Sequence, residues 1–181
     1  MKYWRMRTEK EKNIHYIGID EENQEKLFPY LFGGERYLDV WDSSVTICIN
    51  EKKNNIEYSD VPMFATQFFI VNEKMLNLLL EYAESEFEIL HINCQEGNYV
   101  LINVIEMVDC IDMEKSIYKV WKGAPSEIKS YEKIYLMKEK LVGKNLFRAK
   151  HTSESFFLCS EKLKNEIENR GIIGLNFELI D

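Results

Sequence analysis

Two carboxylates, those of Asp109 and Asp112, follow a nearly continuous apolar run and are the first side chains to consider for chemistry. Paired carboxylates can act as general acid and base, or as ligands for a hard cation. Acidic residues that follow a strand more often cap the next turn by accepting hydrogen bonds from backbone N–H groups. They can also belong to a protein-binding surface. All three roles remain open at the level of sequence, with capping the commonest of them.

Cys110 lies between these carboxylates, and a fold that brought His91 beside it would create a nucleophilic dyad. Two neighbouring negative charges would raise the pKa of the thiol, which argues against a reactive thiolate. His91-x2-Cys94 is an isolated pair and makes a poor metal site. The sequence also lacks a phosphate-binding glycine loop, a nucleophile elbow and a His-Glu zinc motif. We therefore expect no catalysis, no cofactor and no metal, with a small enzyme built on Asp109, Asp112 and His91 as the alternative.

The apolar run before these carboxylates covers residues 99–108 and contains neither Gly nor Pro. It is rich in Val and Ile, whose stiff branched side chains pack well on a pleated sheet. A run of this kind is typical of a strand covered on both faces, although a buried helical segment has the same hydrophobicity. The sequence predicts a buried central strand here.

An internal repeat relates residues 68–77 to residues 156–165, with half of the ten positions identical. Each copy is an apolar run followed by Asn72 or Ser160, which are good helix N-caps, and then by Glu. This pattern predicts helices over 73–84 and 161–170, each leading to a strand that contains Phe-Glu. The predicted fold is α+β: a mixed, mainly antiparallel sheet with two helices, built around two strand–helix–strand repeats that flank the central strand.

The net charge of −8 is unevenly distributed along the 181 residues. Residues 75–114 contain no Lys or Arg, whereas ten basic residues lie in 115–150. The two segments can pair in space, or they can leave a negative surface suited to a basic protein partner and unsuited to nucleic acid. Candidate partner-binding residues are, first, Asp109, Asp112 and Glu114, and then Glu84, Glu86, Glu88 and Trp121. A large aromatic residue such as Trp121 is usually part of the core, although at an exposed edge it would be a natural binding hot spot.

Several motifs occur in the order seen in a known family. They are Tyr99-x3-Asn103-Val104-x3-Val108-Asp109-Cys110-Ile111-Asp112-x3-Ser116, Leu146-Phe147-Arg148, Phe157-Leu158-Cys159-Ser160-Glu161-x-Leu163 and Gly171-x2-Gly174-Leu175-x-Phe177. The chain resembles the bacterial polymorphic-toxin immunity proteins, in the immunity-eleven class, formerly a domain of unknown function. The resemblance covers about residues 60–181. We expect residues 1–59 to form a strand-rich N-terminal part of the same body.

This resemblance implies a protein that binds and neutralises a cognate toxin, without catalysis. The first seven residues lack the apolar core of a signal peptide, and no stretch reaches the ~20 apolar residues of a membrane span. We therefore expect a cytoplasmic protein whose partner is a toxin, itself expected to be basic, with neither nucleic acid nor membrane involved. A generic protein-interaction module is the remaining alternative.

Overall fold

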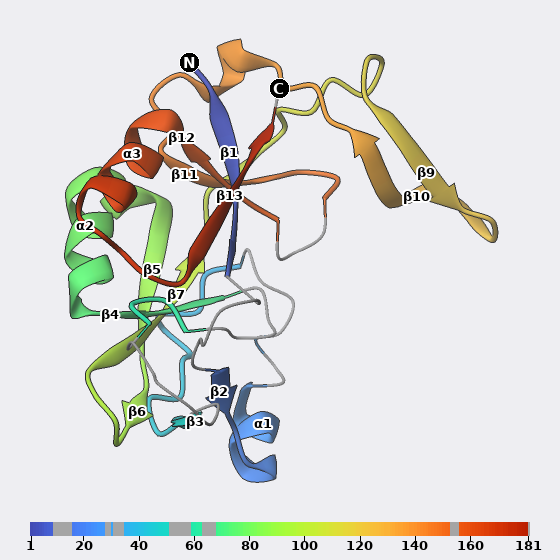
Figure 1. Ribbon diagram of the computed structural model, residues 1–181. Helices are drawn as coiled ribbons and strands as arrows, with labels where there is room; N and C mark the ends of the chain where they lie inside the picture. Colours follow the sequence, from blue (N-terminus) through green and yellow to red (C-terminus); the bar gives the residue numbers. More distant parts are fainter. Residues whose placement is uncertain are drawn as a thin grey trace.

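A computed structural model describes residues 1–8, 16–27, 30, 35–50, 59–62, 68–152 and 156–180 (Figure 1). It confirms the α+β class. The elements follow in the order β1 (Tyr3–Thr8), β2 (Tyr16–Gly18), α1 (Glu21–Leu27), β3 (Thr46–Asn50), β4 (Phe69–Asn72), α2 (Glu73–Ala83), η2 (Glu84–Glu86), β5 (Phe87–His91), β6 (Asn93–Cys94), β7 (Tyr99–Val104), β8 (Met107–Val108), β9 (Ile117–Trp121), β10 (Ala124–Lys133), η3 (Lys138–Leu141), β11 (Leu146–Ala149), β12 (Phe157–Ser160), α3 (Glu161–Asn169) and β13 (Leu175–Ile180).

The strands of the described chain are divided among several sheets. A five-stranded sheet has the order β13-β1-β12-β11-β8, and a three-stranded sheet has the order β4-β7-β5. A second three-stranded sheet, β2-β3-β6, and the β9-β10 ribbon complete the set. Neighbouring strands are antiparallel except in the pairs β11–β8 and β3–β6.

The predicted repeat is present as two strand–helix–strand units with the same topology. In the first unit β4, α2 and β5 enclose β7, which pairs antiparallel with both strands. In the second unit β12, α3 and β13 enclose β1 in the same way. The registers also match, because Tyr99 lies opposite the cap Asn72 and Tyr3 lies opposite the cap Ser160. The inner strand therefore comes from later in the chain in one unit and from the N-terminal segment in the other.

Both repeat helices begin and end close to their predicted positions. The Asn72 side chain accepts a hydrogen bond from the Met75 N–H at 3.1 Å, and Ser160 Oγ accepts from the Leu163 N–H at 3.2 Å. After α3, Gly171 adopts a φ of 60°, a left-handed conformation that glycine takes without a steric penalty. The two helices lie side by side on one side of the molecule (Figure 1).

The apolar run 99–108 forms two strands rather than one, so its predicted extent is wrong although its central place is right. β7 ends at Val104, and the chain crosses to the five-stranded sheet, where β8 pairs with β11. At the crossing, the Glu86 carbonyl accepts hydrogen bonds from the N–H groups of both Ile105 and Glu106. The run thus connects the two sheets.

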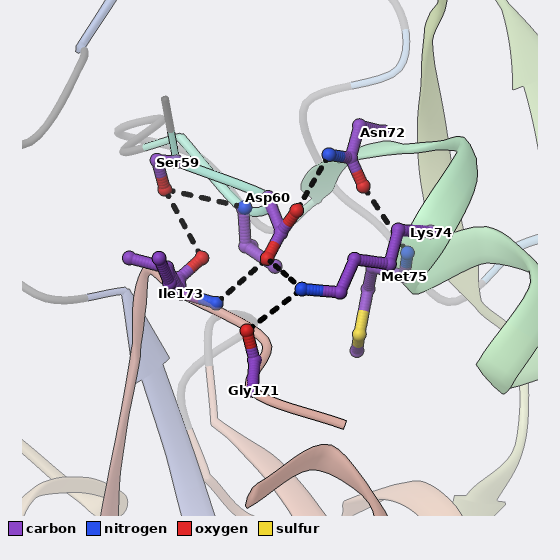
Figure 2. A network of polar contacts seen from close by, with 8 residues as sticks. Ser59, Asp60, Asn72, Lys74, Met75, Gly171 and Ile173 are labelled. Atoms are coloured by element: carbon purple, nitrogen blue, oxygen red, sulfur yellow. Dashed lines mark hydrogen bonds and ion pairs between the residues drawn. The ribbon is translucent and has the colours of Figure 1, made fainter. Parts of the chain in front are cut away.

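The two units share one hydrophobic core, in which Phe69 of β4 packs against Phe157 of β12 with ring centroids 4.2 Å apart. A polar junction lies beside it (Figure 2). The buried Asp60 carboxylate accepts hydrogen bonds from Asn72 Nδ2 at 2.7 Å, from the Ile173 N–H at 2.8 Å and from Lys74 Nζ at 3.3 Å. Lys74 also donates to the Gly171 carbonyl at 2.7 Å. The junction therefore joins the start of α2 to the turn after α3.

Candidate partner-binding surface

A two-stranded ribbon, β9 paired with β10, extends away from the rest of the molecule (Figure 1). Trp121 pairs with Ala124, so the turn consists of Lys122 and Gly123. β10 begins directly after this turn, at Ala124, and ends at Lys133. We call this ribbon the arm.

The arm exposes four large apolar side chains on one strand. Ile117 is 52%, Tyr118 38%, Val120 39% and Trp121 50% exposed to solvent. We call these four residues the arm surface. Because side chains alternate along a strand, Ile117 and Trp121 lie on one face of the ribbon and Tyr118 and Val120 lie on the other. An isolated two-stranded ribbon is at best marginally stable in water, and exposed apolar side chains gathered on one element mark interaction sites in soluble proteins. The arrangement is suited to docking against another protein.

The segment that follows β8 holds the base of the arm. Ile111 forms a β-bridge with Leu136, the Asp112 N–H donates to the Tyr135 carbonyl at 2.9 Å, and the Met137 N–H donates to the Cys110 carbonyl at 2.8 Å. Cys110, Ile111 and Leu136 are all buried. The Asp-Cys-Ile-Asp motif thus anchors both ends of the arm to the five-stranded sheet.

Asp112 has the local capping role. Its Oδ1 accepts from the Lys115 N–H at 3.1 Å, and its Oδ2 lies 2.6 Å from Lys115 Nζ. The hydrogen bond from the Lys115 ammonium is the largest cause that lowers the pKa of Asp112. The Ser116 N–H donates to the Asp112 carbonyl, and Ser116 Oγ accepts from the Tyr135 N–H at 3.0 Å. Asp112 therefore fixes the turn from which β9 departs.

The residues proposed for a catalytic alternative are not brought together. The exposed Asp109 carboxylate lies 3.8 Å from Nε2 of His151, a histidine that no sequence motif singled out. His91 ends β5 in another sheet, where its carbonyl accepts from Trp41 Nε1 at 2.6 Å. Burial, and after it the charge of Asp109, raises the pKa of the Cys110 thiol to about 12, so this thiol stays protonated at neutral pH. Within the described ranges, no cluster of three or more His, Cys, Asp or Glu residues could hold a metal ion.

Two acidic candidates of the second group, Glu86 and Glu88, are buried. Glu86 is 5% exposed and accepts from the N–H groups of Asn145 and Leu146, at 2.9 and 2.7 Å. Glu88 is 7% exposed and accepts from the Tyr37 N–H at 2.8 Å and from Asn103 Nδ2 at 3.1 Å. Both carboxylates accept hydrogen bonds from backbone N–H groups inside the fold. This burial corrects their assignment to a partner-binding surface. The Glu84 side chain lies outside the described residues.

The acidic and basic segments pair in part. Lys144 Nζ lies 2.6 Å from Glu106, and Lys115 Nζ lies 2.6 Å from Asp112. Asp109 and Glu114 stay exposed at the base of the arm.

A cleft of about 770 Å³ lies between the arm and the five-stranded sheet. Its floor includes Arg5, Arg7, Phe156 and Glu178, its wall is formed by residues 128–134 of the arm and its base, and His151 and Thr152 also line it. Sequence reasoning did not find this site, because β1, the arm and β13 are far apart in the chain.

Comparison with known proteins extends the sequence resemblance to the N-terminal strand. No curated protein matched the chain. In the described part of the chain, no helix combines the length and apolar character needed to cross a membrane. A family model described as "Immunity protein family (Imm11)" matches residues 4–181, which include β1 from its second residue onward as well as both strand–helix–strand units. The chain therefore belongs to the Imm11 immunity protein family.

Proposed function

We propose that this protein binds and neutralises a cognate bacterial toxin in the cytoplasm, as the immunity partner of a polymorphic toxin system, and that it does so without catalysis. Family membership supports the immunity role. The arm surface carries the proposal of direct binding, because Ile117, Tyr118, Val120 and Trp121 are exposed together on a ribbon that extends from the body. Large aromatic residues of this kind dominate the binding energy of protein interfaces.

Charge supports a basic toxin as the partner. Asp109 and Glu114 are exposed at the base of the arm, and the chain carries a net charge of −8. Complementary charge of this kind speeds association and orients the partner, while the apolar contacts hold the complex. Asp112 contributes indirectly, because its bonds to Lys115 position the start of the arm.

The proposal is tested by protection and complex formation. The neighbouring gene is induced alone and together with this protein, while growth and co-purification are followed. We expect rescue with a stoichiometric complex. Rescue without any complex would indicate an enzyme that reverses the damage, and killing that continues despite co-expression would overturn the immunity proposal.

An arm variant identifies the docking surface. In Val120→Asp/Trp121→Ala we expect the Kd for the toxin to rise at least about 30-fold, since a hot-spot residue contributes about 2 kcal/mol or more. The thermal stability of the protein should change little, because both side chains are exposed. Val142→Asp is the matched control, because Val142 is 80% exposed and lies outside the arm.

Two results would remove the arm from the interface. One is protection by the arm variant equal to that of the wild type. The other is a dimer of the protein alone that the same variant dissociates, which would assign the arm surface to contact between two copies of this chain. Sedimentation of the unbound wild type and variant distinguishes the second case.

A further inference from the structure

We propose that the cleft between the arm and the five-stranded sheet receives a carboxylate-bearing segment of the toxin; this inference rests on the proposed function. The cleft would then bind an acidic side chain of a partner that is otherwise basic. Together with the exposed carboxylate of Asp109, it would fix the orientation of the bound toxin.

The floor of the cleft is one face of the second strand–helix–strand unit. Along β1, Trp4 and Met6 face α3 and its core, so Arg5 and Arg7 lie on the opposite face. Glu178 of β13 lies directly opposite Arg5 and shares that face. The cleft residues are therefore placed by the strand alternation of β1 and β13.

In the first unit, the equivalent face of the sheet is covered by other parts of the chain. By register, Leu101 of β7 is equivalent to Arg5, and Leu90 of β5 is equivalent to Glu178. Leu90 and Leu101 are fully buried in a cluster with Tyr37, Val45 and Phe68 from other segments of the chain. The second unit has charged residues at the equivalent positions, and they line a cleft. At these two positions, therefore, the first unit has a hydrophobic core and the second unit has a polar cleft, while Leu158, opposite Arg5, stays buried.

Arg5 has the surroundings of an anion-binding residue. Its guanidinium carbon lies 4.1 Å from the centre of the Phe156 ring, and its side chain is only 22% exposed. Nη1 lies 4.0 Å from Glu178, at the limit of an ion pair, and the buried Nε has no hydrogen-bond partner among the described residues. A guanidinium held flat against a ring is preorganised to bind a carboxylate through two parallel hydrogen bonds.

Positive charge prevails among the described residues that line the cleft. The cations are Arg5, Arg7, Lys129 and Lys133, and the carboxylates are Glu132 and Glu178. Glu132 is paired with Lys119 of the arm at 2.7 Å, and Glu178 accepts from Arg7 at 2.7 Å. This local excess occurs in a chain with a net charge of −8, so the cleft presents a field opposite to that of the whole protein.

Size and position favour a protein segment as the occupant. A volume of about 770 Å³ lies within the range of ordinary ligand pockets, roughly 300–1,000 Å³, and accommodates a few side chains. A nucleic acid would place many phosphates near a protein of net negative charge. The cleft also adjoins the arm surface, because Lys129 lines it and lies 4.9 Å from the Trp121 ring. A toxin docked on the arm would reach it directly.

The test compares two double variants that remove the same charge. Arg7→Gln/Lys133→Gln changes the cleft, and Lys138→Gln/Lys140→Gln changes exposed lysines of η3 outside it. We expect the cleft variant to bind the toxin at least about tenfold more weakly and the control to bind within twofold of the wild type. A Lys substitution at one acidic residue of the toxin should restore binding to Arg7→Glu. Wild-type affinity in the cleft variant would overturn this inference and leave the proposed function intact.

If the wild type does not bind the toxin at all, the proposed function fails and a second measurement decides about the cleft alone. A ¹⁵N-labelled sample is titrated with hexaglutamate and, separately, with a thymidine oligonucleotide. Hexaglutamate should shift the backbone signals of Arg5, Arg7 and residues 128–134, and Arg7→Gln/Lys133→Gln should abolish the effect. Absence of these shifts, or tighter binding of the oligonucleotide at the same residues, would overturn the inference.

Discussion

Phe69 and Phe157 occupy equivalent positions in the two strand–helix–strand units and pack against each other, with ring centroids 4.2 Å apart and ring planes tilted by 44°. By register, Phe69 lies opposite Ile102 of the inner strand of its unit, and Phe157 lies opposite Met6. A contact between equivalent residues is typical of an isologous, two-fold arrangement. The repeat is therefore a packing relationship as well as a similarity of sequence.

Replacing this aromatic pair should reveal direct coupling between the units. Phe69→Leu and Phe157→Leu each lower the free energy of unfolding, and in the double variant we expect a coupling energy of about 1 kcal/mol, the size measured for aromatic pairs. Denaturant unfolding of the four proteins gives this value. Strict additivity would mean that the two rings fill space independently.

Gly174 should tolerate no side chain. It has a φ of +113°, and a Cβ there would lie 2.2 Å from Ser59 Oγ and 2.4 Å from the Val61 carbonyl oxygen. We expect Gly174→Ala to lower the free energy of unfolding by at least about 3 kcal/mol, from backbone strain and overpacking together. Gly143, with a φ of +80° and open space where a Cβ would lie, is the control, and Gly143→Ala should cost about 1–2 kcal/mol. Equal losses in urea unfolding would show that the contact with Ser59 and Val61 has no effect.

Asp60→Asn should loosen the junction shown in Figure 2. An amide group turns one acceptor oxygen into a donor, which then opposes either Asn72 Nδ2 or the Ile173 N–H. The expected loss is about 2 kcal/mol, as for a hydrogen bond to a charged group. Lys74→Met should cost less, because Lys74 is half exposed. A loss for Asp60→Asn no larger than that for Lys74→Met would assign the junction a minor role.

Glu86 should give the protein a distinctive dependence on pH. Burial raises the pKa of its carboxyl above the ordinary 4.5, although two backbone N–H groups and Lys144 oppose the shift. Between the pKa of Glu86 in the unfolded state and its raised pKa in the folded state, the folded protein binds more protons than the unfolded one. The free energy of unfolding therefore falls as the pH rises through this window. Glu86→Gln cannot titrate and should lack that part of the slope. Parallel profiles of unfolding free energy against pH for the two proteins would contradict the assignment.

The helices could be predicted from sequence because local signals specify them: Asn72 and Ser160 cap them at the start, and Gly171 ends the second. The division of the strands between the sheets could not be predicted in this way. It depends on the Glu86 carbonyl, which receives the Ile105 and Glu106 N–H groups from a distant part of the chain. The Phe-Glu pairs Phe87-Glu88 and Phe177-Glu178 also suggested a wrong alignment of the last strands of the two units. By register, Phe177 is equivalent to Ile89 and Glu178 is equivalent to Leu90.

The candidate site was predicted only in part for the same reason. Asp109, Asp112 and Trp121 were candidates because of their residue types and their places in the sequence. In the structure they lie at the base of the arm or on it. Burial of Glu86 and Glu88 depends on the partners that the fold supplies. The cleft needs three segments to come together, and no local pattern in β1 reveals that Arg5 will lie above Phe156.

The position of β1 inside the second unit imposes an order of events during synthesis on the ribosome. The first unit can close as soon as β7 has emerged, since β4, α2, β5 and β7 are nearly consecutive. β1 emerges before all of them, yet both of its pairing edges remain open until β12 and β13 follow at the other end of the described chain. Nascent chains halted before β12 should therefore leave Trp4 and Met6 accessible to chaperones, and protease footprinting of such chains would show whether β1 waits in this way.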